Sequence, residues 1–120
     1  MRQRIVPLLL LVATWSLVAC SSSSSPSEPD RPVWLTALIA EIQAQPATNP
    51  PSSIWRYRYH GEIVYYRPPV CCDVFGDLYD EEGNLICHPD GGIAGNGDGR
   101  CPDFFDVRTG ETLIFRDPRG

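Results

Sequence analysis

The chain has 120 residues and a formal net charge of −5, with ten arginines, no lysine and fifteen acidic residues. An acidic chain without a basic cluster is poorly suited to neutralising phosphates, which argues against nucleic-acid binding and against attachment to anionic lipid by charge alone. The length allows one small domain, and a core of that size usually needs a disulfide or metal staple.

The N-terminal segment has the pattern of a bacterial export signal. Two arginines precede an apolar run that is shorter than the ~20 residues of a membrane-spanning helix. The following Leu-Val-Ala-Cys at 17–20 resembles the lipobox of bacterial lipoproteins, which implies cleavage before Cys20 and acylation of its thiol. We therefore expect residues 1–19 to be a signal peptide and Cys20 to be a lipid anchor in the cell envelope. By the same resemblance, Ser21 implies the outer membrane.

Residues 20–32 form a polar run rich in Ser and Pro, with nothing to bury. We expect them to be a disordered tether between the lipid and the domain. Loss of residues 1–19 removes two arginines, so eight arginines face fifteen acidic residues and the net charge becomes −7. Residues 33–120 remain as a single domain.

One helix is predicted over residues 33–45, which Pro46 ends. Its apolar side chains recur at helical spacing, and they are Trp34, Leu35, Leu38, Ile39 and Ile42. A helix this short is unstable alone in water, so it must pack against another element.

A β-hairpin is predicted next, with strands at 54–59 and 62–67 joined by His60 and Gly61. Five large aromatic residues lie in these strands, at Trp55, Tyr57, Tyr59, Tyr65 and Tyr66. We expect Trp55 and Tyr57 to be core under the helix. Tyr59, Tyr65 and Tyr66 are candidate binding aromatics, because interfaces favour Tyr.

Two further hairpins are predicted, one joining 78–79 to 85–86 and one joining 105–107 to 112–115. Between them, residues 89–99 contain five glycines and are predicted to be a loop. The expected fold is α+β, with one N-terminal helix packed on a small antiparallel β-sheet of hairpins and stapled by two disulfides.

Four cysteines remain once Cys20 is acylated, and they are Cys71, Cys72, Cys87 and Cys101. An even number in an exported chain predicts two disulfides. A bond between adjacent cysteines departs from ordinary disulfide geometry, so we expect Cys71 and Cys72 each to pair with Cys87 or Cys101, in either of two patterns. A zinc site that adds His88 is the alternative, but zinc ligands are usually two to four residues apart.

The glycine-rich loop is a candidate calcium or recognition loop through Asp90, Asn96 and Asp98, followed in the chain by Asp103 and Asp106. Oxygen ligands on a flexible backbone suit calcium. Their spacing fits neither the helix–loop–helix calcium motif nor a nonapeptide repeat. The alternative is that Asp and Asn side chains cap their own turns.

Catalytic residue types are scarce. Residues 54–120 contain no Ser and no Lys, and the only imidazoles, His60 and His88, are expected at turns or on the surface. We therefore predict that the protein is not an enzyme and has no cofactor.

An ordered set of short motifs lies between Trp55 and Phe104, namely Cys-Cys-Asp, Leu-Tyr-Asp, Gly-Asn-Leu-Ile-Cys and Gly-Asp-Gly-Arg-Cys-Pro-Asp-Phe. The set resembles a family of small secreted bacterial lipoproteins of unknown function. The resemblance implies a secreted, disulfide-bearing domain and brings no activity. We expect a lipid-anchored binding or envelope-structural module with an unidentified partner. The alternatives are a secreted inhibitor of a protease or other hydrolase, and a calcium-dependent adhesion or sensor domain.

Overall fold

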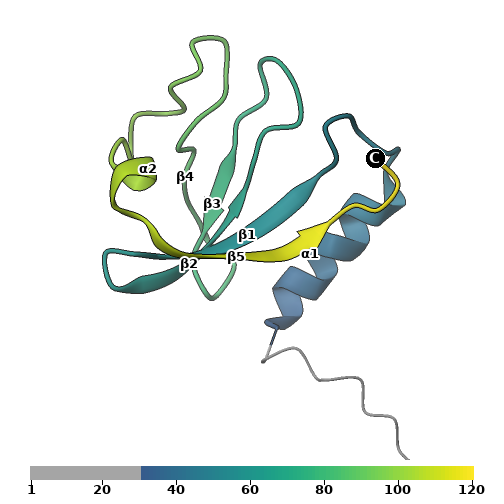
Figure 1. Cartoon of the computed structure of the whole chain (residues 1–120), viewed down its shortest axis with the longest axis horizontal. Coiled ribbons are helices and arrows are strands. Elements are labelled where there is room, and N and C mark those ends of the chain that lie inside the picture. Colours follow the sequence, from purple (N-terminus) through teal and green to yellow (C-terminus); the bar gives the residue numbers. More distant parts are fainter. Residues whose placement is uncertain (1–30) are drawn as a thin grey trace, which may run out of the picture.

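The computed structural model describes residues 31–120, so the expected signal peptide, Cys20 and all but the end of the expected tether lie outside the described residues. The described chain forms one antiparallel sheet of five strands in the order β4-β3-β2-β1-β5 (Figure 1). The strands are β1 (Ser53–Tyr59), β2 (Glu62–Arg67), β3 (Asp77–Tyr79), β4 (Leu85–Cys87) and β5 (Thr109–Arg116). Two helices accompany them, α1 (Val33–Ala44) and α2 (Phe104–Val107).

Three of the predicted elements are confirmed. Helix α1 ends one residue before the predicted boundary, and β1 and β2 form the predicted hairpin. At its turn, His60 and Gly61 have φ angles of +49° and +79°, and two-residue hairpin turns favour such positive values because they match the twist of the strands. Strands β3 and β4 also pair as predicted.

The third predicted hairpin is wrong. The residues expected to form its first strand are in α2, and Thr109 and Gly110, expected at its turn, belong to β5. Strand β5 pairs with β1, with Trp55 opposite Leu113, and so completes the far edge of the sheet. Phe104 accounts for the change, because its side chain is fully buried and the single turn of α2 carries it into the core.

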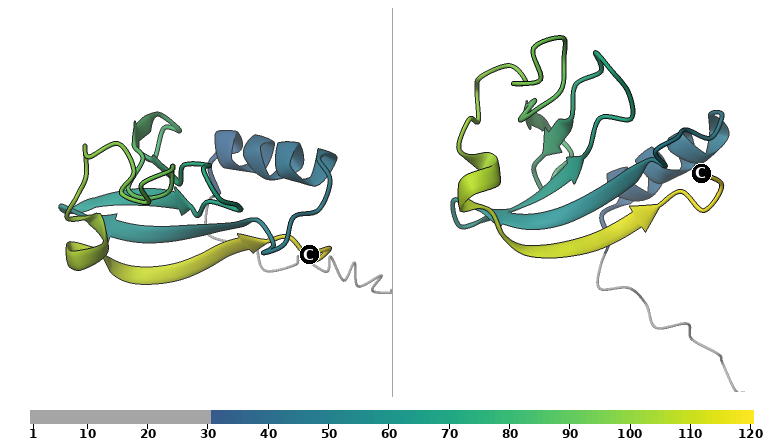
Figure 2. Two further views of the ribbon diagram at one scale, coloured as in Figure 1. Left: turned by 90° about the horizontal axis from the view of Figure 1, so that it is seen from above. Right: turned by 45° about the horizontal axis from the view of Figure 1, so that its top comes forward.

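The expected α+β fold is also wrong. The protein is mainly a five-stranded antiparallel sheet, with one helix of twelve residues and a second of four. It is not a set of hairpins under one helix, because β5 reaches the sheet from a distant part of the chain. The two helices lie at opposite ends of the sheet (Figure 2).

Helix α1 covers part of one face of the sheet. Buried Leu35, Ile39 and Ile42 pack with Ile54 and Tyr65. The indole of Trp34 lies edge-on to the ring of Tyr65 at 5.4 Å, and its N–H donates to the carbonyl of Glu81 at 2.7 Å. Trp34 is therefore part of this core, as expected, with its polar edge satisfied.

The opposite face has a second core, which the sequence did not predict. Its buried members are Tyr57, Val64, Tyr66, Leu78, Cys87, Cys101 and Phe104. Alternation along β2 separates the two cores, since Ile63 and Tyr65 face α1 whereas Val64 and Tyr66 face Phe104. Tyr57 is a buried core residue and contacts Phe104, and Trp55 packs, partly buried, against the same cluster. The expectation that they lie under the helix is therefore wrong.

The C-terminal segment ties α1 to the sheet. The Arg119 guanidinium donates to the carbonyl oxygens of Ile42 and Gln45 at the end of α1, at 3.3 and 3.0 Å. The same group forms an ion pair of 2.7 Å with Asp117, whose side chain is buried. A cation at a helix C-terminus satisfies carbonyl groups that have no partner within the helix.

Candidate functional site

Two long connections meet at one end of the molecule, at the top of Figure 1. We call residues 71–76 and 88–99 the loop tip. Backbone hydrogen bonds join its two segments, from Gly76 N–H to the Asp90 carbonyl (3.1 Å) and from Gly92 N–H to the Val74 carbonyl (3.2 Å). The two loops are therefore one bonded unit, and the glycine-rich segment is more ordered than its composition suggests.

Two disulfides hold the loop tip, as the cysteine count predicted, but the predicted pairing is wrong. The bonds are Cys71–Cys72 and Cys87–Cys101. Cys87 and Cys101 are both buried in the Phe104 core and close the base of the glycine-rich loop. Because Cys87 and Cys101 pair there, Cys71 and Cys72 bond to each other, and both remain exposed in the other loop.

The structure does not bring the three candidate calcium ligands together. The carboxylate of Asp90 accepts from the Tyr66 hydroxyl at 2.6 Å, whereas that of Asp98 accepts from the backbone N–H groups of His88 and Arg100 at 3.1 and 3.0 Å. Asn96 is exposed. No group of three or more His, Cys, Asp or Glu side chains within residues 31–120 is placed to hold a metal ion.

The carboxylate of Asp98 holds a turn, as the alternative to calcium predicted. Although burial opposes the shift, the hydrogen bonds from Arg100 and His88 hold the pKa of Asp98 below its usual value. Close packing also shapes this part of the loop. Gly97 has a φ of +66°, and a Cβ there would overlap the carbonyl oxygen of His88, so the loop needs glycine at this position.

Exposed apolar side chains gather on the loop tip. The exposed fractions are 48% for Val74, 42% for Phe75 and 96% for Ile93. A hollow of about 370 Å³ opens beside them, lined by Asp73, Phe75, Gly91, Gly92, Ile93, Ala94 and Gly97. Large apolar side chains that share a rigid, hollowed surface are typical of a binding site.

Two neighbours hold Phe75 in place. Its ring stacks on the His88 imidazole with 4.8 Å between centroids, and it lies so close to Gly92 that a Cβ there would be 2.7 Å from the ring. His88 Nδ1 is in turn 3.0 Å from the carboxylate of Asp77 and 2.9 Å from the carbonyl of Gly76. The exposed ring of Phe75 is therefore a fixed feature of the surface.

Two of the candidate binding aromatics belong to the cores instead. Tyr65 is buried under α1 and Tyr66 is buried against Phe104, with exposed fractions of 6% and 5%. Burial raises the pKa of the Tyr66 hydroxyl well above its usual value, and the hydrogen bond to Asp90 adds to the effect. These side chains support the sheet and are not available at the surface.

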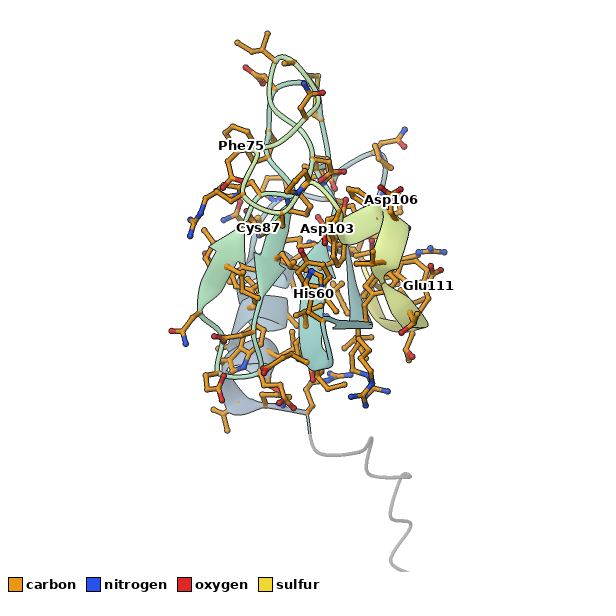
Figure 3. The ribbon with its side chains drawn as sticks, turned by 90° about the vertical axis from the view of Figure 1, so that its left-hand side faces the viewer. His60, Phe75, Cys87, Asp103, Asp106 and Glu111 are labelled. Carbon is orange, nitrogen blue, oxygen red and sulfur yellow. A yellow bond between two sulfur atoms is a disulfide. The ribbon has the colours of Figure 1, made fainter. Side chains whose placement is uncertain are left out.

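Tyr59, the third candidate, belongs to a polar cluster near the β1–β2 turn. Its hydroxyl donates to Asp103 Oδ1 at 2.5 Å, and His60 Nε2 lies 2.8 Å from Asp103 Oδ2. Figure 3 shows His60 next to Asp103, with Phe75 above them in the loop tip. Burial and the bond to Asp103 raise the pKa of Tyr59 to about 12, and the same bond lowers the pKa of Asp103.

This polar cluster resembles half of a catalytic triad, since a carboxylate orients an imidazole. The side chain of His60 is 61% exposed, and residues 54–120 contain no Ser. The cluster joins the β1–β2 turn to the segment before α2, so a structural role accounts for all its contacts.

The sequence predicted the glycine-rich loop as a candidate site, but it did not predict three residues that line the hollow, Asp73, Phe75 and Ile93. The available signal was the presence of large apolar residues in otherwise polar or glycine-rich loops. Val74 and Phe75 follow the cysteine pair directly, and Ile93 interrupts the glycine run.

Comparison with known proteins identifies one family. A family model described as a domain of unknown function, DUF6970, matches residues 40–117, which is more than half of the chain. No curated protein and no solved structure shows significant similarity to it. The match spans all five strands and the loop tip.

Proposed function

This chain belongs to the DUF6970 family of domains of unknown function, and we propose that it is a lipid-anchored binding module of the bacterial cell envelope. The exposed apolar surface of the loop tip carries the proposal. Phe75 and Ile93 are displayed on a frame held by two disulfides, and burying them against a partner would remove apolar area from water.

The anchor is proposed from the lipobox-like residues 17–20, with Cys20 acylated and Ser21 directing the protein to the outer membrane. Two or more acyl chains on one residue hold a protein stably to a bilayer. Within residues 31–120, no helix is both long enough and apolar enough to cross a membrane. The intact mass of the membrane-extracted protein should show loss of residues 1–19 and added acyl mass. Unlipidated mature protein would refute the anchor.

The placement of the loop tip suits a tethered binding module. The described chain enters at the start of α1, at the bottom of Figure 1, and the loop tip lies at the top. A tether that joins the domain at residue 31 would therefore leave the loop tip facing away from the membrane. Partners in the periplasm or on another molecule of the envelope could then reach it.

Site-specific crosslinking in cells tests the binding function. A photoreactive amino acid in place of Ile93, which is 96% exposed, should yield a discrete crosslinked partner. The matched control is Val33, which is 87% exposed but lies at the start of α1. Equal crosslinking from both positions, or none from Ile93, would refute the loop tip as the binding surface.

A second candidate function is inhibition of a protease or another hydrolase. The Cys87–Cys101 bond and the backbone bonds to the neighbouring loop hold the glycine-rich segment, and a loop ordered in advance loses less entropy when it enters an active site. This candidate predicts that the crosslinked partner is a hydrolase and that it loses activity in a one-to-one complex.

A further inference from the structure

We infer that the hollow of the loop tip binds an arginine side chain presented by a partner protein, an inference that rests on the proposed binding function. The hollow combines one carboxylate, one exposed aromatic ring and a glycine-rich wall. No positively charged residue lines it. A guanidinium group is planar, pairs with carboxylates and stacks on aromatic rings, so it matches both functional groups at once.

Asp73 supplies the negative charge. Its side chain is exposed at the edge of the hollow, and no hydrogen bond or ion pair within residues 31–120 involves its carboxylate. Of the other carboxylates near the hollow, Asp77 lies against His88 and Asp98 holds its turn. Asp90 accepts from Tyr66 through Oδ2, and its Oδ1 has no partner but is buried, out of reach of a ligand in the hollow. The carboxylate of Asp73 is therefore the one left to meet a ligand.

Phe75 supplies the stacking surface. Because His88 supports one side of the ring and Gly92 packs closely against it, the side chain does not need to be ordered when a ligand arrives. Arginine stacking on aromatic rings already occurs in this protein, where the Arg108 guanidinium lies 4.6 Å from the ring centroid of Tyr57 and 4.7 Å from that of Phe105.

Size and charge point to a side chain of a protein and not to a large ligand. A volume of about 370 Å³ is near the lower end of the range for ligand sites, which is enough for one long side chain. Residues 31–120 contain eight arginines and thirteen acidic residues, a net charge of −5 that attracts a cationic partner. Ile93, which lines the hollow, would cover apolar surface around the bound group.

Peptide titration tests the inference. The full-length protein in detergent, labelled with nitrogen-15, would be titrated with the blocked peptide Gly-Gly-Arg-Gly-Gly and with its citrulline analogue, which is isosteric and neutral. The arginine peptide should shift the amide signals of Gly91, Gly92 and Ala94 to saturation. The citrulline peptide should bind at least several-fold more weakly, because it lacks the charge that pairs with Asp73.

Two variants locate the site. Asp73→Asn and Phe75→Leu should each weaken arginine-peptide binding about two- to fivefold, the range expected for one exposed ion pair or one exposed cation–π contact. Asp106→Asn is the matched control, because it removes an exposed carboxylate on α2 and should leave binding unchanged. Unchanged amide signals outside the loop tip would show that each variant is folded.

Other outcomes overturn the inference. Equal binding of the citrulline peptide, an equal loss in Asp106→Asn, or no shift in the loop tip would exclude an arginine site. Concentration-dependent shifts without peptide would assign the hollow to a second copy of the chain, and shifts on adding neutral lipid vesicles would assign it to a membrane. If Ile93 still crosslinks a partner while the peptide fails, the binding function stands and only the arginine inference is lost.

Discussion

Removing the Cys87–Cys101 bond is expected to destabilise the protein far more than removing the Cys71–Cys72 bond. The first closes a loop of 15 residues, and loop entropy makes such a bond worth about 3 kcal/mol. The second joins neighbours and closes no intervening chain, so its loop-entropy contribution is close to nothing. Burial also predicts the larger loss for the first bond, because Cys87 and Cys101 are only 1% and 4% exposed.

The expected loss is large for a protein of this size. At about 0.05–0.15 kcal/mol per residue, residues 31–120 would have a total stability of roughly 5–13 kcal/mol. A loss of about 3 kcal/mol should lower the Tm by roughly 12–24 °C in a domain of this length.

Urea unfolding of the full-length protein, followed by Trp fluorescence, would compare two double variants. They are Cys87→Ala with Cys101→Ala, and Cys71→Ala with Cys72→Ala. The first should shift the midpoint strongly and the second only slightly. An equal or larger loss from the second double variant would refute the reasoning, and so would mass spectrometry that finds Cys71 bonded to Cys87 or Cys101.

Four further predictions follow from individual contacts. Gly95 and Gly97 both have positive φ, but only Gly97 is crowded by neighbouring atoms. In chemical unfolding, Gly95→Ala should therefore lower the free energy of unfolding by about 1 kcal/mol through backbone strain. Gly97→Ala should lower it by about 1–3 kcal/mol more, because the added Cβ overlaps its neighbours. Arg119→Ala should lower the Tm by several degrees because α1 loses its tie to Asp117, whereas Arg100→Ala, with an exposed side chain, should not. Stability should fall as pH rises from about 10 to 12, because burial raises the pKa values of Tyr59 and Tyr79 to about 12. In that range the folded state keeps protons that the unfolded state loses above about 10. Tyr59→Phe should reduce this pH dependence in thermal melts. Millimolar calcium should leave the Tm unchanged, since Asp90 and Asp98 have other partners, and a rise that is absent in the Asp90→Ala, Asp98→Ala double variant would restore the calcium hypothesis.

Local sequence patterns determined the elements that depend on near neighbours. The apolar spacing of residues 33–45 predicted α1, because a helix must bury one face. The alternation in 54–67 around His60 and Gly61 predicted the first hairpin, because its turn and its register are set within a few residues. The cysteine count predicted two disulfides, and the polar glycine-rich composition predicted an exposed loop.

Contacts between distant residues were decided only by the tertiary structure. Strand β5 pairs with β1 across more than fifty residues, and no local pattern distinguishes that pairing from a nearby hairpin. Phe104 looks like any aromatic residue in the sequence, yet it fills the core on the face opposite α1 and so draws Cys101 to Cys87. The cysteine pairing and the surface of the loop tip both follow from that packing, because a side chain's neighbours depend on how the whole sheet closes over it.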